Sequence, residues 1–208
     1  MSDFRTDEEQ AEALKKWWSE NGKYIIAGVV IGIGAIFGWR GYNTHLGQQS
    51  LEASNLYEQM IIASREDDTE NVAAFANQII ENYKSTTYAT FATLMLAKQA
   101  AENGKYDDAE SHLRWVISNA SQEEFEHVAR LRLARVLIAA EKITDAEKLL
   151  ATKSVGEFSP RYEELRGDIL VKQNKIDEAR KAYEKALVNS ATESNPILQM
   201  KLDDLGRS

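Results

Sequence analysis

An uncharged run of sixteen residues near the start of the chain constrains its structure most. The run extends from Tyr24 to Trp39, reads YIIAGVVIGIGAIFGW, and is closed by Lys23 and Arg40. As a helix it is shorter than a hydrocarbon core of about 30 Å, but Lys and Arg can lengthen the span because their charged groups reach the lipid surfaces. Tryptophans and tyrosines flank the run where an aromatic belt would lie. The run therefore predicts a transmembrane helix over residues 23–41.

Two other structures could contain such a run. A cleaved signal peptide is disfavoured because the preceding segment is long and acidic and no Ala-x-Ala site follows. A buried core helix of a soluble protein is disfavoured because the run is rich in glycine and is flanked by Lys, Arg and Trp. Both remain open at this point as alternatives to a span.

The Lys and Arg residues around the run predict its orientation. Upstream are Arg5, Lys15, Lys16 and Lys23, whereas downstream Arg40 is followed by no Lys or Arg before Arg65. Positive residues favour the cytoplasmic side of a span. We therefore expect residues 1–22 to form a cytoplasmic segment and residues 42–208 to lie outside the cytoplasm, in the periplasm of a bacterium.

The segment before the span has its own helical pattern. Ala11, Leu14, Trp17 and Trp18 fall on one stripe, which fits either a helix lying on the inner membrane surface or a simple lead into the span. Asn21-Gly22 is a turn-forming pair and predicts a break between this helix and the next.

The run also contains two small-xxx-small pairs, Gly28 with Gly32 and Gly34 with Gly38. Such pairs let another membrane helix approach closely, although glycine is also simply common in membrane helices. Because the two pairs do not share one face, at most one pair is expected in a single tight contact.

Composition disfavours several classes of function. The net charge of −8 disfavours a nucleic-acid binder, and the absence of cysteine excludes disulfides and thiolate metal sites. His45, His112 and His127 lack the spacing of metal ligands, and phosphate-binding, dinucleotide-binding and nucleophile-elbow motifs are absent from the sequence. We therefore expect no catalytic residues, no metal site and no cofactor.

Residues 42–208 contain an internal repeat. Apolar residues recur there at spacings of three and four, which predicts helices throughout. Three segments share a helix, a short polar turn and a second helix, and their turns read GKYDDA, EKITDA and NKIDEA, ending at Ala109, Ala146 and Ala179. These alanines are 37 and 33 residues apart, which brackets the tetratricopeptide period of about 34 residues.

Residue sizes in these segments support the same fold. The first helices carry a small residue where two helices would cross, and the second helices carry a large residue that would fill the gap to the next helix. The small residues are Ala97, Ala134 and Gly167, and the large ones are Leu113, Leu150 and Tyr183. Each pair leaves an apolar face open, so the pairs are expected to stack into an array with a concave side.

The predicted fold class is therefore all-α, with a single N-terminal transmembrane helix followed by a tetratricopeptide-like helical-repeat domain, an α-solenoid. Residues 47–84 predict a further, degenerate pair, with Leu51 and Met60 among the apolar residues of its first helix. At the other end, Asn195-Pro196 predicts the start of a short capping helix that includes Ile197 and Leu198.

The first helices of such arrays line the concave face. Counting along the repeat predicts a protein-binding groove with the following residues: Phe91, Leu94, Lys98, Val128, Leu131, Arg135, Ile138, Arg161, Glu164, Asp168 and Val171. An apolar floor with two stacked cations would suit an extended apolar segment that carries an acidic residue. The alternative is that several of these residues pack against the degenerate first pair or the capping helix.

Several motifs together resemble a known family. Glu20-Asn21-Gly22-Lys23, the glycine-spaced span, Gly38-Trp39-Arg40 and the three loose repeats resemble the ancillary SecYEG translocon subunit family of bacterial inner membranes. The resemblance extends from about Glu8 to Leu205, although the repeats lack the consensus first-helix Trp and closing Pro.

The resemblance implies a single-span inner-membrane protein with a periplasmic repeat domain. Such a protein would sit beside the Sec translocon and pair with a membrane-anchored periplasmic chaperone of the peptidyl-prolyl isomerase type, assisting nascent or unfolded secreted and membrane-inserted proteins. The family has no catalytic motif to transfer. The alternative is a structural scaffold that docks other membrane proteins through its span without binding clients.

Overall fold

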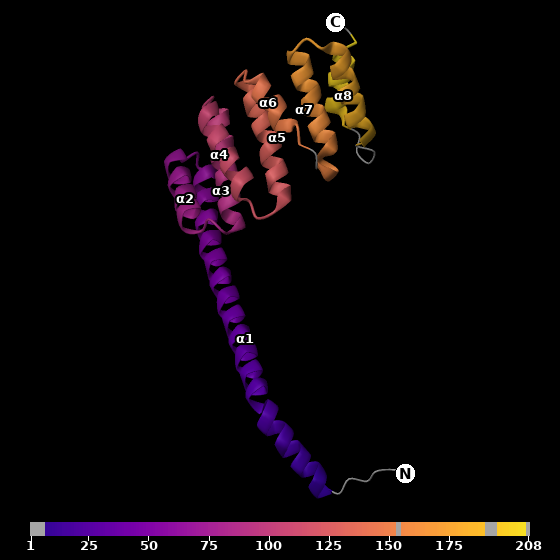
Figure 1. Ribbon diagram of the computed structural model, residues 1–208. Helices are drawn as coiled ribbons and strands as arrows, with labels where there is room; N and C mark the ends of the chain where they lie inside the picture. Colours follow the sequence, from indigo (N-terminus) through magenta and orange to yellow (C-terminus); the bar gives the residue numbers. More distant parts are fainter. Residues whose placement is uncertain (1–6, 153–154, 190–194, 207–208) are drawn as a thin grey trace, which may run out of the picture. The chain divides into compact units, whose positions relative to one another are not determined.

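The computed structural model describes residues 7–152, 155–189 and 195–206. Every regular element in these ranges is a helix (Figure 1). The helices are α1 (Asp7–Arg65), α2 (Thr69–Asn82), α3 (Thr87–Glu102), α4 (Tyr106–Asn119), α5 (Glu123–Ala139), α6 (Ile143–Leu150), η1 (Gly156–Phe158), α7 (Ser159–Lys172), α8 (Ile176–Asn189) and α9 (Pro196–Asp204). Backbone contacts divide the chain into two units, one up to Gln49 and one from Ser50 onward.

The first unit contains the candidate membrane span. Within the described residues, α1 is the one helix long and apolar enough to cross a membrane. Its most apolar 18-residue window has a mean hydropathy of 1.6 and is only 6% buried, whereas the core helix of a soluble protein is mostly buried. Ile31 and Phe37, for example, are 71% and 68% exposed. Apolar side chains exposed on all sides of a helix fit a lipid environment.

The predicted break at Asn21-Gly22 is wrong, because α1 continues through both residues. The Asn21 side-chain amide donates to the Trp17 carbonyl at 3.0 Å, one helical turn earlier. The Trp18 ring lies over Gly22, where an added Cβ would stand 3.1 Å from the indole. Local side-chain contacts thus keep this pair of turn-forming residues helical.

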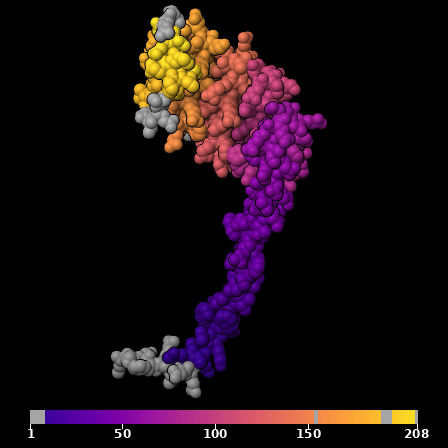
Figure 2. Space-filling view, turned by 180° about the vertical axis from the view of Figure 1, so that it is seen from behind, coloured from indigo at the N-terminus to yellow at the C-terminus, as the bar shows by residue number. Residues whose placement is uncertain are grey.

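The described part of the second unit contains four helix pairs, the single turn η1 and α9. The end of α1 pairs with α2, and α3 with α4, α5 with α6 and α7 with α8 form the pairs that follow (Figure 1). Figure 2 shows them as contiguous layers in sequence order, from the purple first pair to the yellow end. The tetratricopeptide-like array predicted from the sequence is confirmed, and residues 47–84 do contribute its first pair.

Contacts between neighbouring pairs define the inner side of the array. They join first helix to first helix, as in α3 with α5 and α5 with α7, and second helix to first helix, as in α4 with α5 and α6 with α7. First helices are thus closer to one another than second helices are. This arrangement places α3, α5 and α7 on the inner, concave side.

The four turns within the pairs share one backbone geometry. Each contains a residue in the left-handed region, namely Asp67, Gly104, Glu141 and Asn174, with φ of 56°, 71°, 59° and 61°. The next amide donates to the carbonyl five residues earlier, from Asp68 to Ala63, Lys105 to Ala100, Lys142 to Leu137 and Lys175 to Leu170, at 2.8–2.9 Å. This is the bond that closes a Schellman helix end. The shared turn gives all four pairs a common register.

In that register the predicted small and large positions are buried in all three recognised repeats. Ala97, Ala134 and Gly167 are buried, and so are Leu113, Leu150 and Tyr183. At Gly167 an added Cβ would overlap the ring of Tyr183, so glycine is required there by the large aromatic partner. The equivalent positions of the first pair hold Met60 and Ala76, both 0% exposed.

The two ends of the array contain both buried and exposed apolar residues, all within or next to the helices predicted there. Leu198 of α9 and Leu205, which directly follows α9, pack with Ala179, Tyr183 and Ala186 of α8. Ile197 is instead 59% exposed, and Leu51 at the other end is 64% exposed, so neither belongs to the core. The Asn195 side chain caps α9 by accepting from the Leu198 amide at 3.1 Å.

Candidate protein-binding groove

The exposed face of α5 forms the centre of the candidate groove. This helix contacts α3 and α7 on either side and α4 and α6 behind it. The remaining face therefore points to the inner side of the array. Arg132, Arg135 and Ala139 are exposed there, at the spacings of three and four that put residues on one stripe of a helix.

Other predicted groove residues of α5 lie at or below that surface. Val128 and Ile138 are half-buried and border the stripe. Leu131 is only 3% exposed, and its counterpart Leu94 in α3 is 8% exposed. Both leucines belong to the hydrophobic core, so they support the groove from beneath and do not form an accessible floor.

Aromatic rings pack together at the α3 side of the groove. The ring of Phe91 lies 5.9 Å from that of Tyr57 in α1 and 5.3 Å from that of Phe125 in α5. Phe91 is thus partly covered by the first pair, as the alternative interpretation of the groove anticipated. About two turns of helix further along, Lys98 is exposed and forms an ion pair with Glu102 at 3.6 Å.

At the α7 end, α9 occupies two of the predicted positions. Lys201 of α9 donates to Glu164 at 2.7 Å and to both carboxylate oxygens of Asp168, at 2.8 and 2.9 Å. The Tyr183 hydroxyl also donates to Asp168, at 2.7 Å. Glu164 and Asp168 are therefore committed to holding the capping helix, while Arg161 remains exposed.

This cluster has altered ionisation. Burial lowers the pKa of Lys201, but the hydrogen bonds to Asp168 and Glu164 outweigh burial and leave the pKa above its ordinary value. Burial, followed by the hydrogen bond to Asp168, raises the pKa of Tyr183. The lysine therefore stays charged and the tyrosine neutral at ordinary pH, which keeps α9 fastened to α7.

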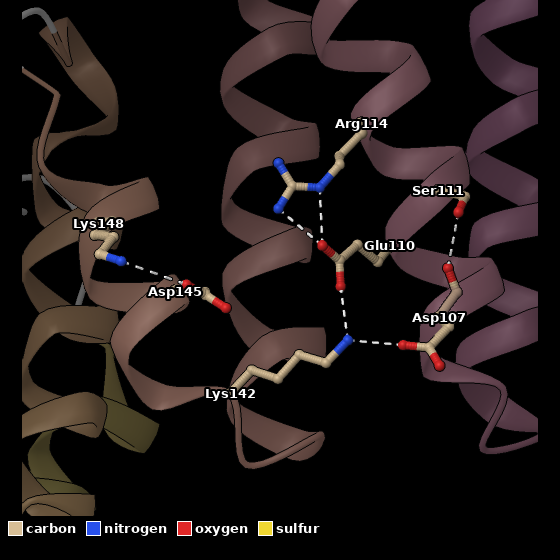
Figure 3. Close-up of polar contacts among 7 residues, drawn as sticks. All are labelled: Asp107, Glu110, Ser111, Arg114, Lys142, Asp145 and Lys148. Atoms are coloured by element: carbon tan, nitrogen blue, oxygen red, sulfur yellow. Dashed lines mark hydrogen bonds and ion pairs between the residues drawn. The ribbon is translucent and has the colours of Figure 1, made fainter.

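The second helices carry a paired set of charges that contrasts with the groove (Figure 3). Lys142, at the start of α6, bridges two acids of α4, at 2.7 Å from Asp107 and 3.1 Å from Glu110. Arg114 also holds Glu110, at 2.8 Å. Hydrogen bonds from Lys142 lower the pKa of Asp107, and those from Arg114 and then Lys142 lower that of Glu110 despite its partial burial. Acids and bases neutralise each other on this face.

Two further predicted features can be placed in the structure. Added Cβ atoms at Gly28, Gly32, Gly34 and Gly38 would meet nothing within 4 Å, so these positions are open for contact with another helix. His127 is buried, with its Nδ1 2.9 Å from the Tyr162 hydroxyl and its ring stacked on Phe158 at 4.8 Å. These contacts account for His127 as a packing residue.

The sequence interpretation missed one functional candidate, Arg132. The available signal was its position three residues before Arg135, which puts the two arginines on the same face of α5. Counting along the repeat selected the positions level with Phe91 and Lys98, and Arg132 falls between them.

Comparison with known proteins agrees with this architecture. A family model described as a tetratricopeptide repeat-like domain matches residues 15–207. The fold and the match together define a tetratricopeptide repeat-like protein that also carries a candidate membrane span.

Relatives of similar length specify the family. The chain is 31% identical to the ancillary SecYEG translocon subunit of Haemophilus influenzae, over 96% of this chain and 97% of the relative. It is 30% identical to that of Escherichia coli, over 99% of both chains, and 29% identical to that of Neisseria gonorrhoeae, over 99% and 100%. No solved structure gives a significant match. The chain belongs to the ancillary SecYEG translocon subunit family.

Proposed function

We propose that this protein is an ancillary subunit of the Sec translocon, anchored in the bacterial inner membrane by one span. The observation that carries the proposal is similarity over nearly the whole chain, span and repeats together, to relatives that are named ancillary SecYEG translocon subunits. A shared repeat domain alone would support only a shared fold. Because the similarity includes both the candidate span and the repeat domain, it supports a shared location at the translocon in the membrane.

The proposed topology has three parts. Residues 1–22 are cytoplasmic, residues 23–41 span the membrane, and residues 42–208 form the periplasmic repeat domain. The excess of Lys and Arg before the span supports this orientation. Alkaline phosphatase fused after Ser208 should be active and a fluorescent protein fused there dark, and the opposite pair of results would reverse the topology.

The proposed mechanism is tethered binding without catalysis. The inner face of α3, α5 and α7 would hold a membrane-anchored periplasmic chaperone of the peptidyl-prolyl isomerase type, or the nascent or unfolded secreted chains that it receives. A tether raises the local concentration of a binding face near the translocon, so a weak affinity suffices. The exposed inner face of α5 supports this role because its arginines and partly exposed apolar residues are accessible.

Site-specific photocrosslinking in membranes tests the proposal. A photoreactive residue at Gly32 should capture a translocon subunit, and one at Arg135 should capture the chaperone or a secreted chain. Lys181, which is exposed on α8, provides a matched control position. If Arg135 captures nothing that Lys181 does not also capture, the groove has no part in the function.

A structural scaffold is the second candidate, and the open glycine positions of the span favour it. A scaffold would act through the span alone. Deleting residues 47–208 should then leave the capture of the translocon from Gly32 and the associated cellular function intact. Loss of the cellular function with retained capture would favour the adaptor.

A further inference from the structure

Three arginines on the inner side of the array lack partners among the residues that the structure describes. Arg132, Arg135 and Arg161 are exposed, and none of them has an ion pair or hydrogen-bonded side-chain partner within residues 7–152, 155–189 and 195–206. We call these residues the arginine stripe. Arg114, Arg130, Arg166 and Arg180, which lie on other faces, each have a carboxylate within 3.4 Å.

Three acids of α3 and α7 already have partners. Glu102 pairs with Lys98, while Glu164 and Asp168 pair with Lys201. Because these acids are engaged elsewhere, the inner face presents three exposed guanidinium groups in a chain whose net charge is −8. Such a local reversal of charge attracts anions to one place on an otherwise anionic protein.

The surroundings of the stripe are partly apolar. Val128 and Ile138 on α5 and Phe91 on α3 are half-buried, and Ala139 and Val171 are exposed. A small inorganic anion would leave these apolar groups in water. A ligand that carries carboxylates beside apolar side chains would cover both kinds of surface.

We propose that the inner face of α5 and α7 recognises polypeptide segments in which acidic and apolar residues alternate. This inference rests on the proposed function and names the chemistry of what the groove binds. Arginine is suited to carboxylates because its planar fork donates two parallel hydrogen bonds. The apolar border favours a polypeptide over an anionic lipid surface, and the net negative charge of the protein would repel such a surface.

The test uses the full-length protein in nanodiscs of zwitterionic lipid. The probe is a fluorescent sixteen-residue peptide that alternates Glu and Asp with Leu and Phe, and its twin carries Gln and Asn in place of the acids. The acidic peptide should bind at least about tenfold more tightly than the twin at low salt, and the difference should shrink in 0.5 M NaCl because exposed pairs are screened.

A charge-reversal variant assigns the binding to the stripe. Arg132→Glu, Arg135→Glu and Arg161→Glu together should weaken binding of the acidic peptide about tenfold or more. Lys84→Glu, Lys105→Glu and Lys181→Glu change the net charge equally at exposed positions outside the inner face, and should change affinity less than twofold. Circular dichroism melting curves establish that both variants are folded.

Three results would overturn the inference. The first is equal binding of the acidic peptide and its amide twin, and the second is equal loss of binding in the two charge-reversal variants. The third is stripe-dependent binding of the protein to anionic vesicles without binding of the peptide, which would assign the stripe to lipid.

If peptide binding fails while Arg135 still crosslinks a chaperone or secreted chain, the adaptor function stands. If peptide binding holds while crosslinking fails, the inference stands without that function.

Discussion

The first helix pair holds Met60 in its first helix and Ala76 in its second, whereas the last pair holds Gly167 and Tyr183 at the same two positions. All four residues are buried, and the shared turn geometry puts them in one register. The middle pairs have an alanine in the first helix and a leucine in the second. As one residue becomes smaller along the array, its partner becomes larger.

The comparison shows that the four pairs share the combined volume of the two side chains at these positions, and not the residue at either position. Interiors are close-packed, so two facing positions must together fill the available space, but either helix can supply the volume. A strict consensus at each position is then unnecessary. The two ends of the array should consequently respond in opposite ways to the same kind of substitution.

The largest effect is expected at the first pair. Met60→Ala would leave two small residues facing each other, and a cavity of that kind costs about 2–5 kcal/mol of unfolding free energy. Ala76→Leu in the same chain reproduces the arrangement of the middle pairs and should restore most of the loss. Urea unfolding of the single and double variants measures this, and additive losses would show that the two positions do not share one space.

The last pair should respond to an added methyl group. Gly167→Ala places a Cβ within the ring of Tyr183, which should cost about 1–3 kcal/mol through overpacking, although alanine is the better helix former. Adding Tyr183→Leu reproduces the pair Ala134 and Leu150, and should recover much of the loss. As a matched control, Ala134→Gly removes a methyl group, and should cost about 1–2 kcal/mol from helix propensity and from the void that the methyl group leaves. A neutral Gly167→Ala would contradict the volume argument.

Sequence reasoning predicted the three later pairs because their turns share lettering and their small residues occur in the expected first helices. The first pair has only a degenerate pattern in the sequence, since Met60 and Ala76 reverse the expected sizes and the turn at Asp67 does not share that lettering. Spacing in the sequence predicts Leu94 and Leu131 in the groove because it places them near the exposed stripe of the first helices. Spacing does not show that neighbouring first helices pack on both sides and cover them.

The α7 end of the groove could not be predicted for a different reason. Lys201 reaches Glu164 and Asp168 from 33 or more residues away in the chain, and a long-range side-chain pair leaves no periodic signal. The candidate span needed no tertiary information, because its apolar run and its flanking charges are local features. The helices that form the groove could thus be predicted from local sequence. The contacts that cover its two ends, from the first pair and from α9, could not.

The turns provide a smaller comparison of the same kind. Gly104 and Glu141 occupy the same left-handed position, with φ of 71° and 59°. A side chain in that region costs about 1 kcal/mol, so Glu141→Gly should raise the unfolding free energy and Gly104→Ala should lower it by a similar amount. Chemical denaturation of both variants measures the two signs. Equal signs would show that contacts of the side chains, and not the backbone, dominate there.

The smallest effect concerns the lysine that follows the left-handed residue in the last three turns. Lys142 bridges Asp107 and Glu110 of the preceding pair. Lys175 at the equivalent position forms no ion pair within the described residues, and Glu147, the equivalent of Glu110, instead accepts a hydrogen bond from Gln173 at 3.0 Å. Lys142→Met should lower stability slightly at neutral pH, and Lys175→Met should not.

The pH dependence of this difference follows from the lowered pKa values of Asp107 and Glu110. The stabilisation is fully present above the ordinary carboxyl pKa of about 4 and is lost as the pH falls through the lowered values. The raised pKa of Lys142 extends its charge above its usual range, so the stabilisation disappears only in strong alkali. Thermal melts of the two variants from pH 2 to pH 8 should therefore differ at pH 7 and converge in acid. A difference that persists at pH 2 would assign the effect of Lys142 to its aliphatic chain.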